Sequence, residues 1–213
     1  MKNIVWDWNG TLLNDRELCL NILNTMLKKR GLPVVSEERY LDIFTFPIIE
    51  YYREAGFDFA REPYPLLADE FMKLYDEREP SVGLFPGAEE ILSFFKNCGI
   101  RQYVLSTTRE QELLLQIGSR GIRDYFKEIR GTDTILAHGK RETAKKWAEE
   151  HKDELGESVF IGDTLHDREV AEIMGIDCIF FSQGHMSRKR LENAGIKIAD
   201  TYEDLKKWIG QSK

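Results

Sequence analysis

The sequence predicts an α/β fold: a doubly wound parallel (Rossmann-like) sheet core with an inserted α-helical domain. From residue 84 onward, short apolar segments of strand length alternate with amphipathic helical patterns, which is typical of repeated βα units. Between residues 14 and 83, helical patterns follow one another and no strand pattern interrupts them. An apolar strand at residues 4–6 precedes this helical block, so the block is an insertion within the sheet domain.

The helical block begins directly after the first strand and its polar turn. Asn14 is expected to cap the first helix, with Glu17 three positions later, and apolar residues recur at helical spacing as far as Leu27. Gly31 and Pro33 end this helix. Three further helices are expected, each at a residue that favours a helix start: Ser36, Pro47 and Pro65.

The remaining elements wind the chain back and forth across the sheet. Four more strands are expected, at residues 102–105, 125–129, 158–161 and 178–181. Helices are expected between these strands and after the last one, at about residues 91–98, 113–117, 140–151, 170–174 and 202–208. We therefore assign residues 1–13 and 84–213 to the α/β core and residues 14–83 to one inserted domain, which we call the cap.

Composition limits the classes of function. Of the 213 residues, 42% are hydrophobic, which is enough for one sizeable core and a smaller second one. The chain has 30 Lys and Arg against 37 Asp and Glu, and it has no basic tract, so we expect no nucleic-acid partner. Its three cysteines lie far apart, and neither a signal-peptide pattern nor an apolar run of membrane-spanning length is present. We therefore expect a reduced, cytoplasmic protein without a membrane partner, as a monomer or a weak homodimer.

The first candidate site residue is Asp7, which follows the first strand and opens a polar turn. Ligands of open α/β sheets bind outside the carboxyl ends of the strands, which is where this residue is expected. Gly10 lets the backbone turn sharply close to a bound group. We expect the site to be built around this turn, which reads Asp7-Trp8-Asn9-Gly10-Thr11-Leu12.

A second group of carboxylates has the same setting. Asp163 and Asp167 follow the apolar strand at 158–161, and if that strand neighbours the first, both carboxylates converge on Asp7. A cluster of uncompensated carboxylates is tolerable chiefly around a divalent cation, and hard oxygen ligands favour Mg²⁺ over Zn²⁺. Taken alone, the two residues are equally consistent with ordinary turn and helix-capping positions.

These two turns resemble the first and fourth motifs of the haloacid dehalogenase superfamily, most of whose members are Mg²⁺-dependent phosphohydrolases. The first motif, Asp-x-Asp-Gly-Thr-Leu, is matched except that Asn9 stands in place of the second Asp. The spacing Gly162-Asp163-x-x-x-Asp167 after a strand is similar to the fourth motif. The resemblance covers nearly the whole chain and is closest to the phosphoglycolate-phosphatase-like group, whose small helical cap follows the first motif.

The resemblance implies a set of site residues. It implies that Asp7, the backbone carbonyl of Asn9 and Asp163 bind Mg²⁺, with Asp167 in support. It further implies that Asp7 attacks the phosphorus of a small phosphorylated substrate and forms an aspartyl-phosphate that water hydrolyses.

The second and third motifs of the superfamily have candidate matches as well. Ser106 ends the strand at 102–105, as the second motif requires of the Ser or Thr that binds a phosphate oxygen, and Thr107 is the alternative. Lys140 matches the third-motif lysine, which offsets charge on the nucleophile and the phosphate, and Arg141 is the fallback. Ser106 taken alone is equally consistent with a solvent-exposed hydroxyl at a strand end. Lys140 taken alone is more readily interpreted as a solvated lysine at a helix start, because the chain has many lysines.

The amide at Asn9 leaves three hypotheses open. In the superfamily the carboxyl group at this position protonates the leaving oxygen and then activates water, which an amide cannot do. General acid–base catalysis contributes about 10²–10⁴-fold, so turnover is expected to be slower while phosphate binding is kept. The first hypothesis is a phosphatase, the second a catalytically impaired phosphate-binding or regulatory protein, and the third, weaker one a haloacid dehalogenase.

Several further residues are candidates with a structural alternative. His166 and His185 follow strands and are more readily interpreted as loop or structural residues. Arg53 and Arg109 are candidates to hold a second substrate anion, and spacing alone assigns neither. The cap is expected to close over Asp7 and exclude water, and its pocket-lining candidates are aromatic residues that helical spacing also assigns to a core: Phe44, Phe46, Tyr51 and Tyr52.

Overall fold

The computed structural model describes residues 1–132 and 138–210, apart from the side chains of residues 138 and 139. In this part of the chain one parallel sheet has the strand order β3-β2-β1-β4-β5-β6. The first strand of the chain lies near the middle of the sheet, and the order reverses at that strand, as in doubly wound folds. The strands are β1 (Asn3–Trp6), β2 (Arg101–Arg109), β3 (Glu128–Thr132), β4 (Ser158–Gly162), β5 (Asp177–Phe181) and β6 (Lys197–Ala199).

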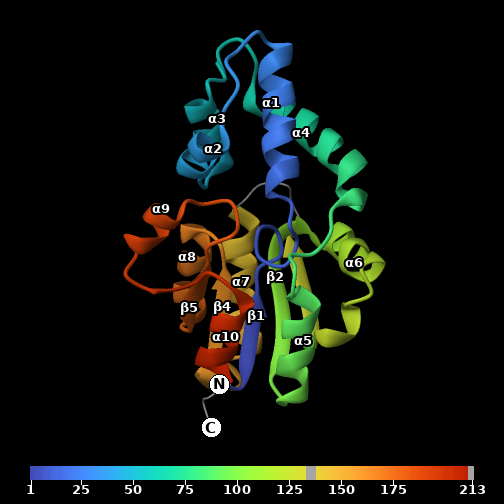
Figure 1. Cartoon of the computed structure of the whole chain (residues 1–213), viewed down its shortest axis with the longest axis vertical. Helices are drawn as coiled ribbons and strands as arrows, with labels where there is room; N and C mark the ends of the chain where they lie inside the picture. The colour runs from blue at the N-terminus through green and yellow to red at the C-terminus, as the bar shows by residue number, and fades with distance from the viewer. Residues whose placement is uncertain (133–137, 211–213) are drawn as a thin grey trace.

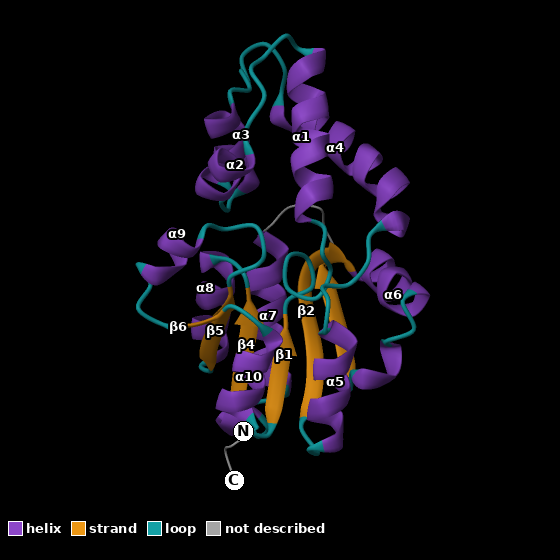
Figure 2. Ribbon diagram, viewed as in Figure 1, coloured by secondary structure: helices purple, strands orange, loops and turns teal. Residues whose placement is uncertain are grey.

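Helices cover both faces of the sheet (Figure 2). The side chains of β1 alternate between the two faces. Ile4 and Trp6 pack in the cluster formed with α5 (Ala88–Asn97), α6 (Glu110–Ser119) and α10 (Tyr202–Ile209). Val5 packs in the opposite cluster with α7 (His138–Glu150) and α8 (Leu165–Met174). Burial on both faces explains why the central strands β1 and β4 are largely apolar.

The inserted helices lie together beyond the carboxyl ends of the strands (Figure 1). They have a hydrophobic cluster of their own, which includes Ile22, Tyr40, Tyr51 and Leu67. These helices are α1 (Arg16–Lys29), α2 (Glu37–Ile43), α3 (Ile48–Ala55) and α4 (Tyr64–Arg78). These helices therefore pack around a core that is separate from the core of the sheet, and the bounds 14–83 stay a prediction.

The two chain segments that join the cap to the core lie side by side. The backbone N–H of Asn14 donates to the carbonyl of Gly83 at 3.0 Å, and that of Phe85 donates to the carbonyl of Leu12 at 2.9 Å. The cap also contacts the core through α2. The Tyr40 hydroxyl lies 2.7 Å from Nδ1 of His185, a residue of the loop after β5. The cap is thus anchored at its linkers and by contacts between α2 and the loop after β5, which include the bond from the backbone N–H of Ser187 to the carbonyl of Leu41 at 3.1 Å.

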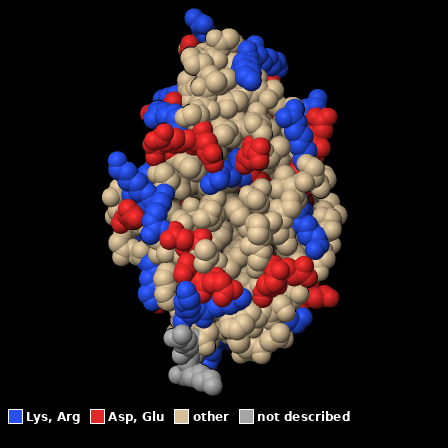
Figure 3. All heavy atoms as spheres, viewed as in Figure 1, with Lys and Arg blue, Asp and Glu red and all other residues tan. Residues whose placement is uncertain are grey.

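On the face of the molecule shown in Figure 3, charged residues are not separated by sign. Figure 3 shows Lys and Arg intermixed with Asp and Glu on the face that it presents. None of the described helices combines the length and the apolar character that crossing a membrane requires.

The two edge strands and one short helix differ from the sequence expectation. The strand expected at 125–129 is β3, three residues later, and Arg123–Tyr125 form a 3-10 turn instead. The register of β3 is set by its pairing with β2, in which Tyr103 pairs with Glu128. Phe126 is buried in the segment between the 3-10 turn and β3. The strand β6 and the short helix α9 (Arg188–Glu192) were not expected, because in neither segment do apolar residues recur at the spacing of a strand or a helix.

The expected Asn14 cap is also wrong. Helix α1 begins at Arg16, and Asp15 precedes it without a side-chain capping bond. The carboxylate of Asp15 is bound instead by groups of the site described below. By contrast, Ser36 caps α2 as predicted, accepting a hydrogen bond from the backbone N–H of Arg39 at 3.2 Å.

Candidate active site

Three buried carboxylates converge at the carboxyl ends of β1 and β4. These strands are neighbours, and the backbone N–H of Asp7 donates to the carbonyl of Ile161 at 2.8 Å. One oxygen from each of Asp7, Asp163 and Asp167 lies within 4.8 Å of the others. The adjacent parallel strands therefore bring together the carboxylates that the sequence places after each of them.

Lys140 neutralises part of this charge. It is 2% exposed at the start of α7, and its Nζ donates to Oδ1 of Asp7 at 2.5 Å and to Oδ1 of Asp167 at 2.6 Å. Burial alone would lower the pKa of Lys140, but the two carboxylates raise it above the ordinary lysine value. Arg141, the fallback candidate, points to the surface and pairs with Glu169. The geometry therefore favours Lys140.

The remaining negative charge in the cluster is poorly compensated. Burial, followed by the charge of Asp167, raises the pKa of Asp7 well above its usual range. Burial likewise raises the pKa of Asp163 to about 7. For Asp167, burial would raise the pKa, but Lys140 holds it below the usual value. A divalent cation would relieve this repulsion, and the three carboxylates supply the hard oxygen ligands that Mg²⁺ prefers.

Two glycines allow the loops to close around Asp163. Gly10 has a φ of +70°, and a Cβ there would lie 2.4 Å from Oδ2 of Asp163. A Cβ at Gly184 would lie 2.1 Å from the same oxygen. The backbone of the next residue, His185, donates to that oxygen at 2.6 Å. Glycine is thus required at both positions by the close approach of the backbone to a site carboxylate.

Asp167 has both roles that the sequence left open, since it caps a helix and also belongs to the carboxylate cluster. It forms a capping box with Thr164 at the start of α8, and its Oδ2 accepts from the backbone N–H of Thr164 at 2.9 Å. Its other oxygen accepts from Lys140 at 2.6 Å. The capping bonds therefore hold the carboxylate in the orientation in which it contacts the lysine.

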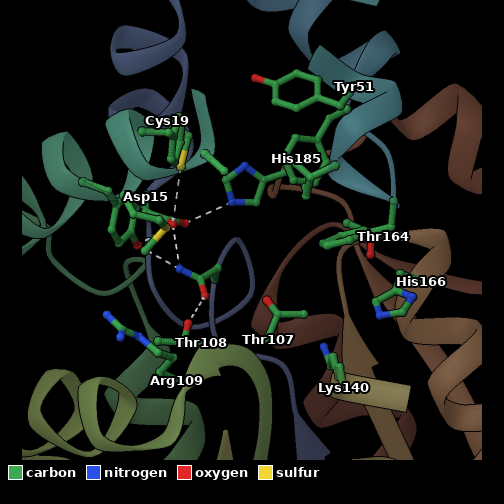
Figure 4. A pocket seen from close by; sticks show the side chains of 18 of the residues that line it. Asp15, Cys19, Tyr51, Thr107, Thr108, Arg109, Lys140, Thr164, His166 and His185 are labelled. Atoms are coloured by element: carbon green, nitrogen blue, oxygen red, sulfur yellow. Dashed lines mark hydrogen bonds and ion pairs between the residues drawn. The ribbon is translucent and has the colours of Figure 1, made fainter. Parts of the chain in front are cut away.

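The side chain of Asn9 is held on three sides. Its Nδ2 donates to Oδ2 of Asp15 and to the hydroxyl of Tyr75, both at 2.8 Å. Its Oδ1 accepts from the hydroxyl of Thr108 at 2.8 Å. The dashed lines in Figure 4 show these contacts on Asp15 and Thr108. The amide is therefore fixed by cap and core residues together.

Asp15 lies at the centre of a second buried polar cluster. Its Oδ1 accepts from the backbone N–H of Gly10 at 3.0 Å and lies 3.1 Å from Nε2 of His185 (Figure 4). Its Oδ2 accepts from Tyr75 at 2.8 Å, and the thiol of Cys19 lies 3.7 Å away. Burial would raise the pKa of Asp15, but His185 holds it below the usual value.

Sequence reasoning missed Asp15, Tyr75 and Thr108. Asp15 adjoins the first motif, but in the sequence it resembles a helix-start residue. Its burial beside Asn9 depends on the direction in which α1 leaves the core. His185, interpreted from the sequence as structural, joins the core loop after β5 to the cap through Asp15 and Tyr40. The sequence signal for these contacts is weak, because they join segments far apart in the chain.

The hydroxyls at the end of β2 are divided between the interior and the site. Ser106 is fully buried, and its hydroxyl donates to Thr108 at 3.2 Å. Thr107 is half-buried and lines the cavity above Asp7, with its side chain on the same side as Lys140 in Figure 4. Thr107, the alternative in the sequence interpretation, is therefore the better-placed hydroxyl.

A cavity of about 240 Å³ opens over Asp7 between the core and the cap. It includes Asp7, Asn9, Lys140, Asp163 and Asp167 on the core side. The cap side is rich in aromatic rings, among them all four that the sequence nominated: Phe44, Phe46, Tyr51 and Tyr52. The residues proposed for chemistry and those proposed for the cap pocket thus share one cavity.

The two arginines considered for a second anion differ in position. Arg109 lines the cavity at the end of β2, where it pairs with Glu112. Arg53 is not among the lining residues and pairs with Glu50 on the exposed side of α3. His166, also a candidate, lines the cavity, and burial lowers its pKa below the usual histidine value.

Comparison with known proteins identifies related sequences and folds. Residues 4–181 match the family of haloacid dehalogenase-like hydrolases. Phosphoglycolate phosphatase from Synechococcus elongatus is 21% identical over 191 residues, covering 90% of this chain and 88% of the relative. Phosphoglycolate phosphatase from Nitrosococcus oceani is 24% identical over 208 residues, covering 94% and 89%.

Solved structures share the fold. A haloacid dehalogenase-like hydrolase from Streptococcus pneumoniae superposes with a TM-score of 0.81 at 18% identity, covering 98% of each chain. A haloacid dehalogenase-like protein from Agrobacterium tumefaciens gives a TM-score of 0.77 at 20% identity, covering 99% of this chain and 98% of the other. The architecture, with the cap included, is therefore that of known proteins over nearly the full length.

Proposed function

The chain belongs to the haloacid dehalogenase-like hydrolase family, and we propose that it is a Mg²⁺-dependent phosphatase that acts through an aspartyl-phosphate intermediate. The observation that carries the proposal is the contact between Asp7 and Lys140 at the base of the cavity. A carboxylate at a strand end, held by a buried ammonium and open to a cavity, is placed to act as a nucleophile.

The residues at the base of the cavity fit a magnesium ion. Asp7, Asp163 and Asp167 offer buried oxygen ligands within 4.8 Å of one another, and Lys140 alone does not balance their charge. Asp7, the backbone carbonyl of Asn9 and Asp163 would hold the ion, with Asp167 in support. When bound, Mg²⁺ would offset the charge of the carboxylates and the phosphate and orient the phosphate.

The chain's own residues would carry the remaining steps. The Asp7 carboxylate attacks phosphorus in line, the bond from phosphorus to the leaving oxygen breaks, and water then hydrolyses the aspartyl-phosphate. The Lys140 ammonium offsets negative charge on the nucleophile and on the phosphoryl oxygens. The Thr107 hydroxyl donates to a phosphoryl oxygen. The cap covers the cavity and excludes water during the attack.

The substrate is proposed to be a small phosphorylated metabolite. The relatives from Synechococcus elongatus and Nitrosococcus oceani are named phosphoglycolate phosphatases, and a cavity of about 240 Å³ suits an ester of that general size. We further propose that the protein works in the cytoplasm, as a monomer or weak homodimer, without a nucleic-acid or membrane partner.

One rival function follows from Asn9. Because its amide cannot exchange a proton usefully, the same site could serve mainly to bind a phosphorylated ligand in a regulatory protein. The two functions share the ligand and differ in turnover. A measurement of steady-state hydrolysis therefore separates them.

The deciding experiment is hydrolysis of p-nitrophenyl phosphate with MgCl₂ by the wild type and by Asp7→Asn. We expect multiple turnovers by the wild type and none by Asp7→Asn. Two further variants serve as comparisons. Asn9→Asp introduces a carboxylate beside that of Asp15. The double variant Asn9→Asp with Asp15→Asn removes the repulsion between the two. Absence of wild-type turnover together with activity of either variant would establish the binding function instead.

A further inference from the structure

The cap side of the cavity is a cage of aromatic rings. Phe44 stacks on His185 with centroids 4.8 Å apart, and Phe46 stacks on His166 at 4.7 Å. Phe44 also contacts Tyr51, with centroids 5.1 Å apart. Phe44 and Phe46 are only half-buried, so parts of their rings remain free to contact a ligand. A flat apolar group is the natural occupant of such a cage.

The described residues that line the cavity offer no unpaired cation. Lys140 is bound by Asp7 and Asp167, and Arg109 is paired with Glu112. The cap and the second polar cluster add further acids to the lining, including Asp15 and Asp69. A leaving group that carries a carboxylate would therefore meet negative charge, and it would have to displace Glu112 to pair with Arg109.

Two polar atoms in the cavity wall lack a partner among the described residues. They are the hydroxyl of Tyr51 and Nε2 of His166, and their side chains are 2% and 6% exposed. Each of these atoms exposes less than 1 Å², so a ligand could bond to it only after the surrounding side chains shift. Neither group is a fixed cation, so neither supplies an ion-pair partner for a substrate carboxylate.

The hydrogen bonds of Asn9 give a separate reason to expect a leaving group that departs without being protonated. Its amide hydrogens bind Asp15 and Tyr75 and its oxygen binds Thr108, so it cannot deliver a proton to a departing alkoxide. A phenol has a pKa of about 10, as in tyrosine, whereas water has one near 15.7 and simple alcohols are comparable. A phenolate therefore departs without protonation far more readily than an alkoxide.

Together, these observations point to one substrate class, and we propose that the site hydrolyses phosphate monoesters of small, single-ring phenols that carry no carboxylate. This inference rests on the proposed phosphatase function and specifies its substrate. In the step, an Asp7 oxygen bonds to phosphorus and the phosphorus–oxygen bond to the ring breaks. The electron pair leaves on the phenolate oxygen, which takes a proton from water. Water then releases phosphate from Asp7, so that one water is consumed overall.

The first test compares three esters with the purified chain in MgCl₂: phenyl phosphate, cyclohexyl phosphate and 2-phosphoglycolate. We expect kcat/KM for phenyl phosphate to exceed that for cyclohexyl phosphate at least tenfold and that for 2-phosphoglycolate at least a hundredfold. Equal rates on the two ring esters, or 2-phosphoglycolate as the best substrate, would overturn the inference and leave the phosphatase function intact. No hydrolysis of any ester would overturn the phosphatase function itself.

Binding provides a second test that does not depend on leaving-group reactivity. In the Asp7→Asn variant with Mg²⁺, calorimetry is expected to give at least tenfold tighter binding of phenyl phosphate than of 2-phosphoglycolate. Phe46→Leu, which removes the ring but keeps apolar volume, should reduce this preference severalfold. Val34→Ala, on the exposed surface of the cap, should leave it unchanged. Equal binding of the two esters, or a preference that survives Phe46→Leu, would contradict the aromatic cage.

Discussion

The side-chain amide of Asn9 donates a 2.8 Å hydrogen bond to the buried carboxylate of Asp15. A carboxylate at position 9 would face Asp15 directly. The amide therefore satisfies an acceptor that a second carboxylate would repel. Asn9 and Asp15 thus form a matched pair, and a change at one residue should depend on the other.

The first prediction is that Asn9→Asp lowers the free energy of unfolding by about 1–3 kcal/mol, because it removes a donor and adds a like charge. Asp15→Asn in the same chain should recover part of this loss, giving a coupling energy of about 0.5–3 kcal/mol between the two sites. Urea unfolding of the wild type, both single variants and the double variant measures the coupling. Strict additivity of the two changes would show that the pair is not matched.

The convergence of the three carboxylates was predictable from sequence. Asp7 and Asp163 each follow a buried strand, and neighbouring parallel strands end at the same edge of the sheet. The choice between Ser106 and Thr107 was not predictable, because β2 is buried on both faces and its apolar pattern does not fix which side chains face the site. Asp15 was missed for another reason: its partners come from α4 and from the loop after β5. Contacts of that kind depend on tertiary packing.

The second prediction distinguishes the two hydroxyls of β2. Thr107→Val removes a hydroxyl from the cavity wall and should lower kcat/KM about 10–100-fold, the effect of one hydrogen bond to a charged group. Ser106→Ala should change kcat/KM less than threefold, because its hydroxyl binds Thr108 in the interior. Steady-state kinetics on phenyl phosphate tests both variants. A larger loss for Ser106→Ala would return the phosphate-binding role to that residue.

The third prediction concerns magnesium. Saturating Mg²⁺ should raise the thermal midpoint of the wild type, since a ligand that binds only the folded state stabilises it by about 2.7 kcal/mol at a hundred times its Kd. Asp163→Asn should abolish the increase, whereas Asp177→Asn, an exposed acid at the start of β5, should retain it. Differential scanning calorimetry with EDTA and with MgCl₂ is the measurement. An unchanged increase in Asp163→Asn would place the ion elsewhere.

The fourth prediction is that Lys140→Met makes the fold more dependent on Mg²⁺. The variant leaves Asp7 and Asp167 buried without their ammonium partner, which should cost about 3–5 kcal/mol when no metal is bound. Because a bound cation can offset the same charges, Mg²⁺ should raise the thermal midpoint more in the variant than in the wild type. Turnover should still fall about 10²–10³-fold, since the charge at the phosphate is no longer offset. An equal response to Mg²⁺ in both proteins would show that lysine and metal act on separate charges.

The fifth prediction concerns the pH dependence of cap stability. Arg30 binds both oxygens of Glu62, each at 2.6 Å, and one oxygen of Glu70 at 2.5 Å, joining α1 to α4. The hydrogen bonds from Arg30 lower the pKa of Glu62, and they lower that of Glu70 although burial alone would raise it. Carboxylates whose pKa is depressed by folding stabilise the fold above their unfolded pKa, about 4.3 for Glu. This stabilisation is lost as the pH falls through their folded pKa.

Arg30→Met should therefore lower the free energy of unfolding at pH 7 by about 1–2 kcal/mol, and the difference from the wild type should shrink as the pH falls below about 4. Urea unfolding at pH 7 and at pH 3.5 measures both differences. Arg61→Met is the matched control, because Arg61 pairs with Asp58 on the open surface and such pairs contribute little. A loss in Arg30→Met that is equal at both pH values would assign the role of Arg30 to its packing on Phe57, whose ring centroid lies 5.6 Å from the guanidinium.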